Sequence, residues 1–218
     1  MTPDLPAGCV IALLGAPSTG KTELANALAA RLAQRGVAVT LVADVSHEWR
    51  MREERTPDDA QLAAIAREQT RLIASAAERG VVVADTTALT TAVHSDTLFG
   101  NDALFANAMT AHRGYAITLL MALDLPCSGD EAERERMDAS LRAALARAGA
   151  PYTVIHGRGP ERLASAWNAI NASAEAAANA SSRGRTGEQQ RLWFWPCDKC
   201  SDPACEHRLF SDLVARRP

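Results

Sequence analysis

Residues 15–22 read Gly15-Ala16-Pro17-Ser18-Thr19-Gly20-Lys21-Thr22, which matches the phosphate-loop pattern G-x-x-x-x-G-K-[ST]. The loop follows an apolar run, Cys9–Leu14, with the length and composition of a buried strand. A helix that starts at such a loop points its positive dipole end, and the loop its backbone N–H groups, at a phosphate. We therefore predict that these residues bind a nucleoside triphosphate, with Lys21 at the β- and γ-phosphates and the Thr22 hydroxyl on Mg²⁺.

The length and composition predict one domain with a sizeable hydrophobic core and a short additional segment. The chain has 218 residues, 47% hydrophobic and 22% charged, and its net charge is −3 at pH 7. That balance gives no reason to expect nucleic acid or a membrane surface as a partner. The sequence starts without the basic segment of a signal peptide, and no apolar run approaches the ~20 residues that cross a bilayer. We expect a cytoplasmic protein.

Short apolar runs alternate with segments of helical periodicity. The runs at 9–14, 37–42, 81–85, 115–124 and 152–156 have the form of buried strands. Between them we expect a helix after the phosphate loop, a long helix capped by Thr56 and stopped by Gly80, two helices within 86–114 that are interrupted at 99–102, one over 131–147 and one from about 161. The alternation predicts an α/β protein with the P-loop nucleoside-triphosphate-hydrolase/kinase fold. Its five parallel strands should lie in the order 2-3-1-4-5, with helices on both faces.

Asp85 ends the third apolar run at the edge of the sheet where ligands bind. We interpret it as the Walker B acid, which holds Mg²⁺ through water or accepts the proton of a substrate hydroxyl. The alternative is an N-cap for a helix that begins at Thr86. Three other side chains are expected to pack or to line a rim: Trp49, His94 and Trp167.

Three segments, 15–22, 85–93 and 119–126, carry a resemblance to a known family. Residues 85–93 read D-T-T-A-L-T-T-A-V, and the fourth strand ends in L-D-L-P. Over residues 9–170 the chain resembles the AAA-type P-loop proteins related to the ribosylnicotinamide kinase domain of the bifunctional bacterial NAD-biosynthesis protein NadR. The resemblance implies a nucleoside-kinase-like fold, ATP and Mg²⁺ as phosphoryl donor, and an acceptor such as nicotinamide riboside, hence NAD metabolism.

The chain departs from that family around the acceptor site and the lid. Cys127 stands where the family often has Trp, the lid segment is compressed to residues 128–136, and His94-Ser95-Asp96 stands where relatives often have Tyr before a Ser-Glu pair. The segment 156–159 lacks the second His of an H-x-G-H adenylyltransferase motif. The resemblance therefore implies the kinase half alone, with an altered acceptor site.

The resemblance also suggests roles for three charged residues. Asp44 follows the second strand, where related kinases often place an acid that contacts substrate; a solvated turn residue is the alternative. Arg134 and Arg136 lie where a lid closes over a triphosphate, and an Arg there stabilises charge on the transferring group. Because glutamates alternate with these arginines, an ordinary solvated helix is an equal alternative. The sequence decides no role for Asp124.

A cluster of soft ligands lies near the end of the sequence. Cys197, Cys200, Cys205 and His207 have the spacing C-x2-C-x4-C-x-H, which suits a tetrahedral zinc site. Free thiols, a redox-labile pair or an iron–sulfur centre are the alternatives. Upstream, the composition shifts to Ala, Ser, Asn, Gly and Arg. We predict a P-loop kinase-like domain at 1–178, a linker at 179–190 and a small C-terminal metal knuckle, the zinc-binding tail, at 191–218.

Two functions of different class fit these features. The first is a small-molecule kinase that transfers the γ-phosphate of ATP to a nucleoside-like acceptor, with Lys21, Asp85, Asp44 and the lid arginines as catalytic residues. The second is a nucleotide-gated regulatory or adaptor ATPase whose zinc-bearing tail binds a protein partner. Neither lysine of the chain has the context of a guanine-selective N-K-x-D motif, which favours ATP over GTP.

Overall fold

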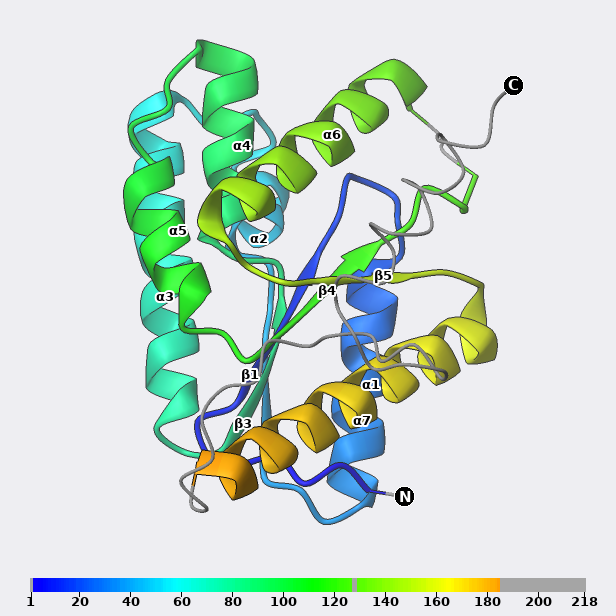
Figure 1. The fold of residues 1–218 in the computed structure, drawn as a ribbon. Coiled ribbons are helices and arrows are strands. Elements are labelled where there is room, and N and C mark those ends of the chain that lie inside the picture. The colour runs from blue at the N-terminus through cyan, green and yellow to red at the C-terminus, as the bar shows by residue number, and fades with distance from the viewer. Residues whose placement is uncertain (1, 127–128, 185–218) are drawn as a thin grey trace, which may run out of the picture. The chain divides into compact units, whose positions relative to one another are not determined.

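The computed structural model describes residues 2–126 and 129–184, and its sheet forms from the predicted apolar runs. Five strands pair in parallel: β1 (Val10–Leu14), β2 (Val39–Val42), β3 (Val81–Asp85), β4 (Ile117–Met121) and β5 (Thr153–Ile155). Their order is β2-β3-β1-β4-β5, which confirms the predicted topology (Figure 1). β1 is central, with Leu13 opposite Asp85 of β3 and Leu14 opposite Leu120 of β4.

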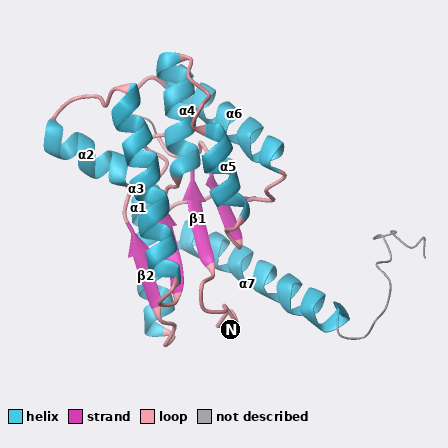
Figure 2. Ribbon diagram, turned by 90° about the vertical axis from the view of Figure 1, so that its left-hand side faces the viewer, coloured by secondary structure: helices cyan, strands magenta, loops and turns pink. Residues whose placement is uncertain are grey.

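Six helices connect the strands in the described part of the chain, and a seventh follows β5. Their bounds are α1 (Lys21–Gln34), α2 (Val45–Glu53), α3 (Asp59–Ala77), α4 (Ala88–Phe99), α5 (Phe105–Arg113), α6 (Glu131–Ala148) and α7 (Gly159–Gly184). α1 and α7 cover one face of the sheet, and α3, α4, α5 and α6 cover the other (Figure 1). In Figure 2 the strand arrows point one way, toward the edge from which α2 projects.

Each face of the sheet carries its own apolar core. On one face, Leu28 of α1 and Ile170 of α7 are fully buried against β1 and β4. On the other, Leu89 of α4 and Leu141 of α6 are fully buried around Leu120. Since burial on both faces removes the polar alternation of a half-exposed strand, β1, β3 and β4 read as continuous apolar runs. This core holds the carboxyl ends of the strands, where the candidate site lies.

The predicted start of the long third helix is wrong by two residues. Its N-cap is Asp58, not Thr56. The Asp58 carboxylate accepts from the Gln61 N–H at 2.9 Å, and the Gln61 side chain accepts from the Asp58 N–H at 2.8 Å. This reciprocal capping box satisfies two backbone donors at once, which a cap at Thr56 would not do. The break at 99–102 that separates α4 from α5 is confirmed.

The last described helix is longer than expected. α7 begins at Gly159 and continues to Gly184, so residues 179–184, predicted to begin the linker, are helical. Alanine has the highest helix propensity, and α7 has six alanines within 172–180, which favours continuation of the helix where apolar periodicity has ended. The compact unit that contains the sheet extends to Ala177. Within the described residues, no helix has the length and apolar character required to cross a bilayer.

Candidate functional site

The phosphate loop joins β1 to α1 at the carboxyl edge of the sheet. At Gly15 a Cβ atom would lie 2.8 Å from Cβ of Met121 and 2.9 Å from Oγ1 of Thr19, so only glycine fits. The buried Thr19 hydroxyl donates to the Ala16 carbonyl at 2.8 Å and closes the loop on itself. Gly20 is the N-cap of α1, in a left-handed conformation with φ +77°, and has no side chain with which to cap the helix. The first turn of α1 is therefore open to an anion.

Lys21 lies against this loop. Its Nζ donates to the carbonyl oxygens of Gly15 and Ala16, both at 2.9 Å. Burial lowers the pKa of Lys21; the Asp85 and Asp44 carboxylates act in the opposite direction, and the Arg50 guanidinium lowers it further. Lys21 therefore shares one electrostatic environment with both acids that the sequence singles out.

Asp85 meets the phosphate loop through Thr22. Its Oδ2 accepts a hydrogen bond from the Thr22 hydroxyl at 2.6 Å, and its side chain is 3% exposed. Oδ1 is buried and has no hydrogen-bond partner among the described residues. Burial raises the pKa of Asp85, although the Thr22 hydroxyl and Lys21 act to lower it. A carboxylate oxygen without a donor beside a threonine hydroxyl is a suitable oxygen ligand set for Mg²⁺. The residues present therefore fit a magnesium ion.

The turn after Asp85 is strained. Thr86 has φ +88°, a conformation that β-branched residues rarely adopt, and its buried hydroxyl has no partner in the described part of the chain. Thr87 then caps α4, because its hydroxyl accepts from the Leu89 N–H at 3.2 Å. The alternative interpretation of Asp85 as a helix cap is therefore wrong. Strain of this kind, of order 1–3 kcal/mol, is concentrated at functional sites.

Asp44 has a structural role as a helix cap, which was not predicted from the sequence. It follows β2 and caps α2, since its Oδ1 accepts from the His47 N–H at 3.1 Å. The carboxylate is half-buried, and its charge raises the pKa of both Lys21 and Asp85. Asp44 therefore belongs to the same charged cluster as the phosphate-loop lysine.

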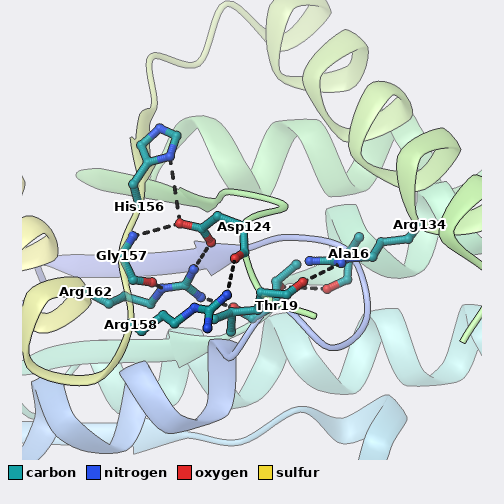
Figure 3. Close-up of polar contacts among 9 residues, drawn as sticks. Ala16, Thr19, Asp124, Arg134, His156, Gly157, Arg158 and Arg162 are labelled. Atoms are coloured by element: carbon teal, nitrogen blue, oxygen red, sulfur yellow. Dashed lines mark hydrogen bonds and ion pairs between the residues drawn. The ribbon is translucent and has the colours of Figure 1, made fainter. Parts of the chain in front are cut away.

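The two predicted lid arginines have different surroundings. Arg134 of α6 is 2% exposed, and its Nη1 donates to the Leu125 carbonyl at 2.8 Å. Its Nε and Nη2 are buried without a partner among residues 2–126 and 129–184, and Figure 3 shows the side chain pointing toward Ala16 of the phosphate loop. The Arg136 side chain is 64% exposed and lies 3.9 Å from Asp130. Arg134 is therefore buried and bonded to Leu125, whose side chain lies beside Gly20 of the loop, whereas Arg136 is in solvent.

Arg162 is the site residue that the sequence analysis missed. It is 4% exposed and donates to the Thr19 carbonyl of the phosphate loop and to the Asp124 carboxylate (Figure 3). Its Nε donates to the Gly157 carbonyl at 2.7 Å, and the Gly157 N–H donates back to Asp124 at 2.8 Å. Burial alone would raise the pKa of Asp124, but the Gly157 N–H and Arg162 together hold it below its usual range. Asp124 therefore supports the phosphate loop through Arg162.

Two cavities lie beside the phosphate loop. The first, about 320 Å³, adjoins Gly20 and lies between the first turns of α1 and the start of α7; it is lined by residues that include Leu24, Ala27, Pro160 and Leu163. The second, about 230 Å³, adjoins Pro17 and is lined by residues of α2, α3, α4 and α6 that include Ser46, Arg50, Leu62, His94 and Met137. His94, expected at a rim or in packing, lines this second cavity. The loop therefore has space for a ligand at each of two positions.

The described residues hold no second group of metal ligands: no three His, Cys, Asp or Glu side chains converge within residues 2–126 and 129–184. The predicted zinc ligands, Cys197, Cys200, Cys205 and His207, lie outside these ranges.

Comparison with solved structures identifies the fold. The chain is similar to a NadR protein in complex with NR, at TM-score 0.58 and 19% identity, and to a NadR protein in complex with NAD and AMP-PNP, at TM-score 0.58 and 18% identity. Each match covers 85% of this chain but 53% and 52% of the NadR chains, so the chain spans about half the length of those proteins. A thymidylate kinase from Ehrlichia chaffeensis matches at TM-score 0.51 and 16% identity, over 79% of this chain and 98% of its own.

Comparison with sequences adds a family. No curated protein matches the chain in sequence. A family model described as an AAA domain matches residues 10–162, from the start of β1 through Arg162. That range contains the phosphate loop, Asp85 and the Asp124–Arg162 pair. The chain therefore belongs to the AAA domain family.

Proposed function

We propose that the protein is a kinase that transfers the γ-phosphate of ATP to a nucleoside-like acceptor. The observation that carries the proposal is the pairing of Thr22 with Asp85 at 2.6 Å, because it brings a metal-binding hydroxyl and a carboxylate together beside the phosphate loop. A P-loop protein with a kinase-type fold and a ligand cavity at each of two positions on its loop suits a donor and an acceptor.

The cavity beside Gly20 is suited to the base of ATP. Leu24 and Ala27 of α1 and Pro160 and Leu163 of α7 provide apolar walls for a flat ring. From there the triphosphate would extend along the phosphate loop, whose N–H groups and Lys21 bind the phosphates. Thr22 and Asp85 would hold Mg²⁺, which neutralises the charge of the phosphate oxygens when bound.

The cavity beside Pro17 is suited to the acceptor. In the transfer, an oxygen of the acceptor forms a bond to the γ-phosphorus while the bond from that phosphorus to the β–γ bridging oxygen breaks, and ADP leaves with the electron pair. Where the acceptor oxygen is a hydroxyl, its proton passes to a carboxylate of the cluster, for which Asp44 is the candidate. The two unpartnered nitrogens of Arg134 supply positive charge to the loop. Arg136, in solvent, has no part in the proposal.

The test measures ADP release by the full chain with Mg²⁺ and ATP against a panel of nucleosides and their 5′-monophosphates, including nicotinamide riboside. We expect at least one acceptor to raise ADP release and to gain a phosphoryl group by mass spectrometry, and Lys21→Ala to abolish the increase. Folded protein that binds ATP without acceptor-dependent release from any compound would contradict the proposal. Turnover of nicotinamide riboside would place the protein in NAD metabolism and accord with a cytoplasmic location.

A second proposal concerns the tail. The spacing of Cys197, Cys200, Cys205 and His207 supports a structural zinc ion, since thiolate and imidazole are the ligands that zinc prefers. Metal analysis should find about one zinc per wild-type chain and clearly less in Cys200→Ser, where loss of one ligand weakens the site. Equal, negligible zinc in both proteins would end this proposal.

The zinc-bearing tail also supports the second function, a nucleotide-gated adaptor that binds a protein partner. Removal of residues after Gln190 should then abolish partner binding and leave ATP affinity unchanged. An unchanged interaction would exclude the tail as the binding element.

A further inference from the structure

One face of α2 carries two donors into the cavity beside Pro17. Ser46 and Arg50 are separated by four positions, which places them one above the other on the same side of the helix. Both line the cavity, as does His94 of α4. α2 has nine residues, and Ser46 lies in its first turn, where the helix dipole favours a negative group.

Neither donor is satisfied within the protein as far as the structure describes it. Ser46 is 5% exposed, and its buried hydroxyl has no hydrogen-bond partner. Among residues 2–126 and 129–184, no carboxylate lies within ion-pair distance of the half-buried Arg50. The cavity's one acid in these ranges, Glu133, is exposed on α6. A buried hydroxyl and a partly desolvated guanidinium are unfavourable unless a ligand completes their hydrogen bonds.

His94 offers a further hydrogen-bonding group in this cavity. Burial, together with the positive charges of Arg50 and Lys21 and against the opposing influence of Asp44, lowers the pKa of His94 to about 4. The imidazole is therefore neutral at pH 7 and adds no positive charge of its own, but it offers a hydrogen bond. A guanidinium, a hydroxyl and a neutral imidazole that line one cavity are donors suited to a phosphate dianion, although the N-terminus of α2 itself is already capped by Asp44.

We propose that Ser46 and Arg50 bind the phosphate group of a nucleoside 5′-monophosphate, so that the acceptor is a nucleotide rather than a neutral nucleoside. This inference rests on the proposed kinase function and narrows its acceptor. An oxygen of the acceptor's phosphate forms the bond to the γ-phosphorus, and ADP leaves with the electron pair of the bond that breaks. Because a phosphomonoester is ionised at pH 7, no proton has to be removed. Asp44 is then not needed as a base, and Asp85 keeps its role at the metal.

The test compares each nucleoside with its own 5′-monophosphate. Binding is measured by calorimetry to the full chain saturated with Mg²⁺ and AMP-PNP, which occupies the donor position. The pairs are adenosine and AMP, cytidine and CMP, uridine and UMP, guanosine and GMP, and thymidine and dTMP. We expect at least one monophosphate to bind 10-fold or more tightly than its nucleoside, and Arg50→Gln to weaken that monophosphate by about 10- to 100-fold.

Two variants separate recognition from general charge. Arg52→Gln removes the same charge from the same helix, but the Arg52 side chain is 69% exposed and paired with Glu53, so the affinity should not change. Ser46→Ala should weaken the monophosphate several-fold and leave the nucleoside unaffected. Unfolding midpoints of all variants establish that α2 remains folded.

The outcomes distinguish the inference from the kinase proposal. Acceptor-dependent turnover of nucleosides at rates equal to or above those of their monophosphates would overturn the inference and keep the kinase. An equal effect of Arg50→Gln and Arg52→Gln on monophosphate binding would overturn the assignment to Ser46 and Arg50 of α2. Failure of all the tested nucleosides and monophosphates to bind would overturn it as well. Tight monophosphate binding lost in Arg50→Gln, with no turnover, would support the site and count against the kinase.

Discussion

The hydroxyl of Thr22 and the Oδ2 atom of Asp85 lie 2.6 Å apart, which joins the first turn of α1 to the end of β3. The two residues are 63 positions apart in the sequence and meet because β1 and β3 are neighbours in the sheet. The bond aims the Asp85 carboxylate at the phosphate loop, where a metal would need it.

Replacement of Asp85 by asparagine removes a metal ligand while keeping the side-chain shape. We expect Asp85→Asn to lower Mg²⁺-dependent turnover by about 100-fold or more, because the charge that holds the metal is lost. Initial rates across a magnesium titration measure the effect. Asp96→Asn, an exposed change on α4, is the control, and equal rates in the two variants would remove Asp85 from the mechanism.

The same substitution should change how stability depends on pH. Burial raises the pKa of Asp85 in the folded protein above its unfolded value, so ionisation opposes folding. Without metal or nucleotide, the contribution of Asp85 to wild-type stability should fall as pH rises from the ordinary aspartate pKa through the raised one, and level off above it. The Asp85→Asn variant lacks this loss. The unfolding free energy of the variant, measured with urea, should therefore rise relative to that of the wild type as pH rises. A difference in unfolding free energy between the two proteins that is constant from pH 3 to pH 8 would contradict the raised pKa.

Gly15 and Gly36 provide a matched pair of substitutions to alanine. A Cβ atom at Gly15 would lie 2.8 Å from Met121, whereas at Gly36, with φ +79°, it would meet nothing within 4 Å. Gly36→Ala should therefore lose only about 1–2 kcal/mol of unfolding free energy to backbone strain. Gly15→Ala should lose more and should also lose ATP binding, since the loop must move. Equal losses with intact ATP affinity would show that the close approach is unimportant.

Removal of Arg162 should destabilise the whole protein. Arg162→Ala removes a buried guanidinium and its hydrogen bonds, and because the Asp124 side chain is 31% exposed we expect a loss of about 2–3 kcal/mol of unfolding free energy. Arg158→Ala is the control, since the exposed Arg158 bonds only to the Asp124 main-chain oxygen in the described contacts, at 3.3 Å; its effect should stay within about 0.5 kcal/mol. Similar losses in both variants would argue against a special role for Arg162.

The Asp124–Arg162 pair should also give the protein an acid-sensitive stability. The pKa of Asp124 in the folded protein lies below its ordinary value, so its contribution is complete above that ordinary value and is lost as pH falls through the folded one. Asp124→Asn should flatten the acid limb of the stability profile, measured by urea unfolding between pH 2 and pH 6. An acid limb as steep as that of the wild type would contradict the assignment.

The sheet could be predicted because its strands are buried on both faces and one motif marks the first of them. β3 and its terminal Asp85 follow from the same reasoning, since a continuous apolar run that ends in an acid is typical of a central parallel strand. α2 was missed because Ser46 is its only buried residue, so the helix has no apolar stripe to reveal it. Two cap candidates lie two positions apart before α3, and only the reciprocal bonds of Gln61 distinguish Asp58 from Thr56.

Contacts between distant segments escaped prediction for a different reason. Arg162 and Asp124 are separated by 38 positions, and neither stands in a local pattern that names the other. Arg134 has glutamates on both sides in the sequence, typical of a solvated helix, yet the fold buries it against the Leu125 carbonyl beyond β4. Whether a helical arginine in such a sequence is buried depends on how its helix packs on the sheet. The local pattern of charges in the sequence does not contain that information.

The contacts of Arg162 have a mechanical consequence. One guanidinium is bonded to the phosphate loop at Thr19, to the chain beyond β4 at Asp124 and to the chain beyond β5 at Gly157. A force on any one of these segments is therefore shared by the other two, so this rim of the sheet behaves as a rigid frame. α2, which packs on α3 and is tied to it through Gln69, takes no part in these three contacts of Arg162.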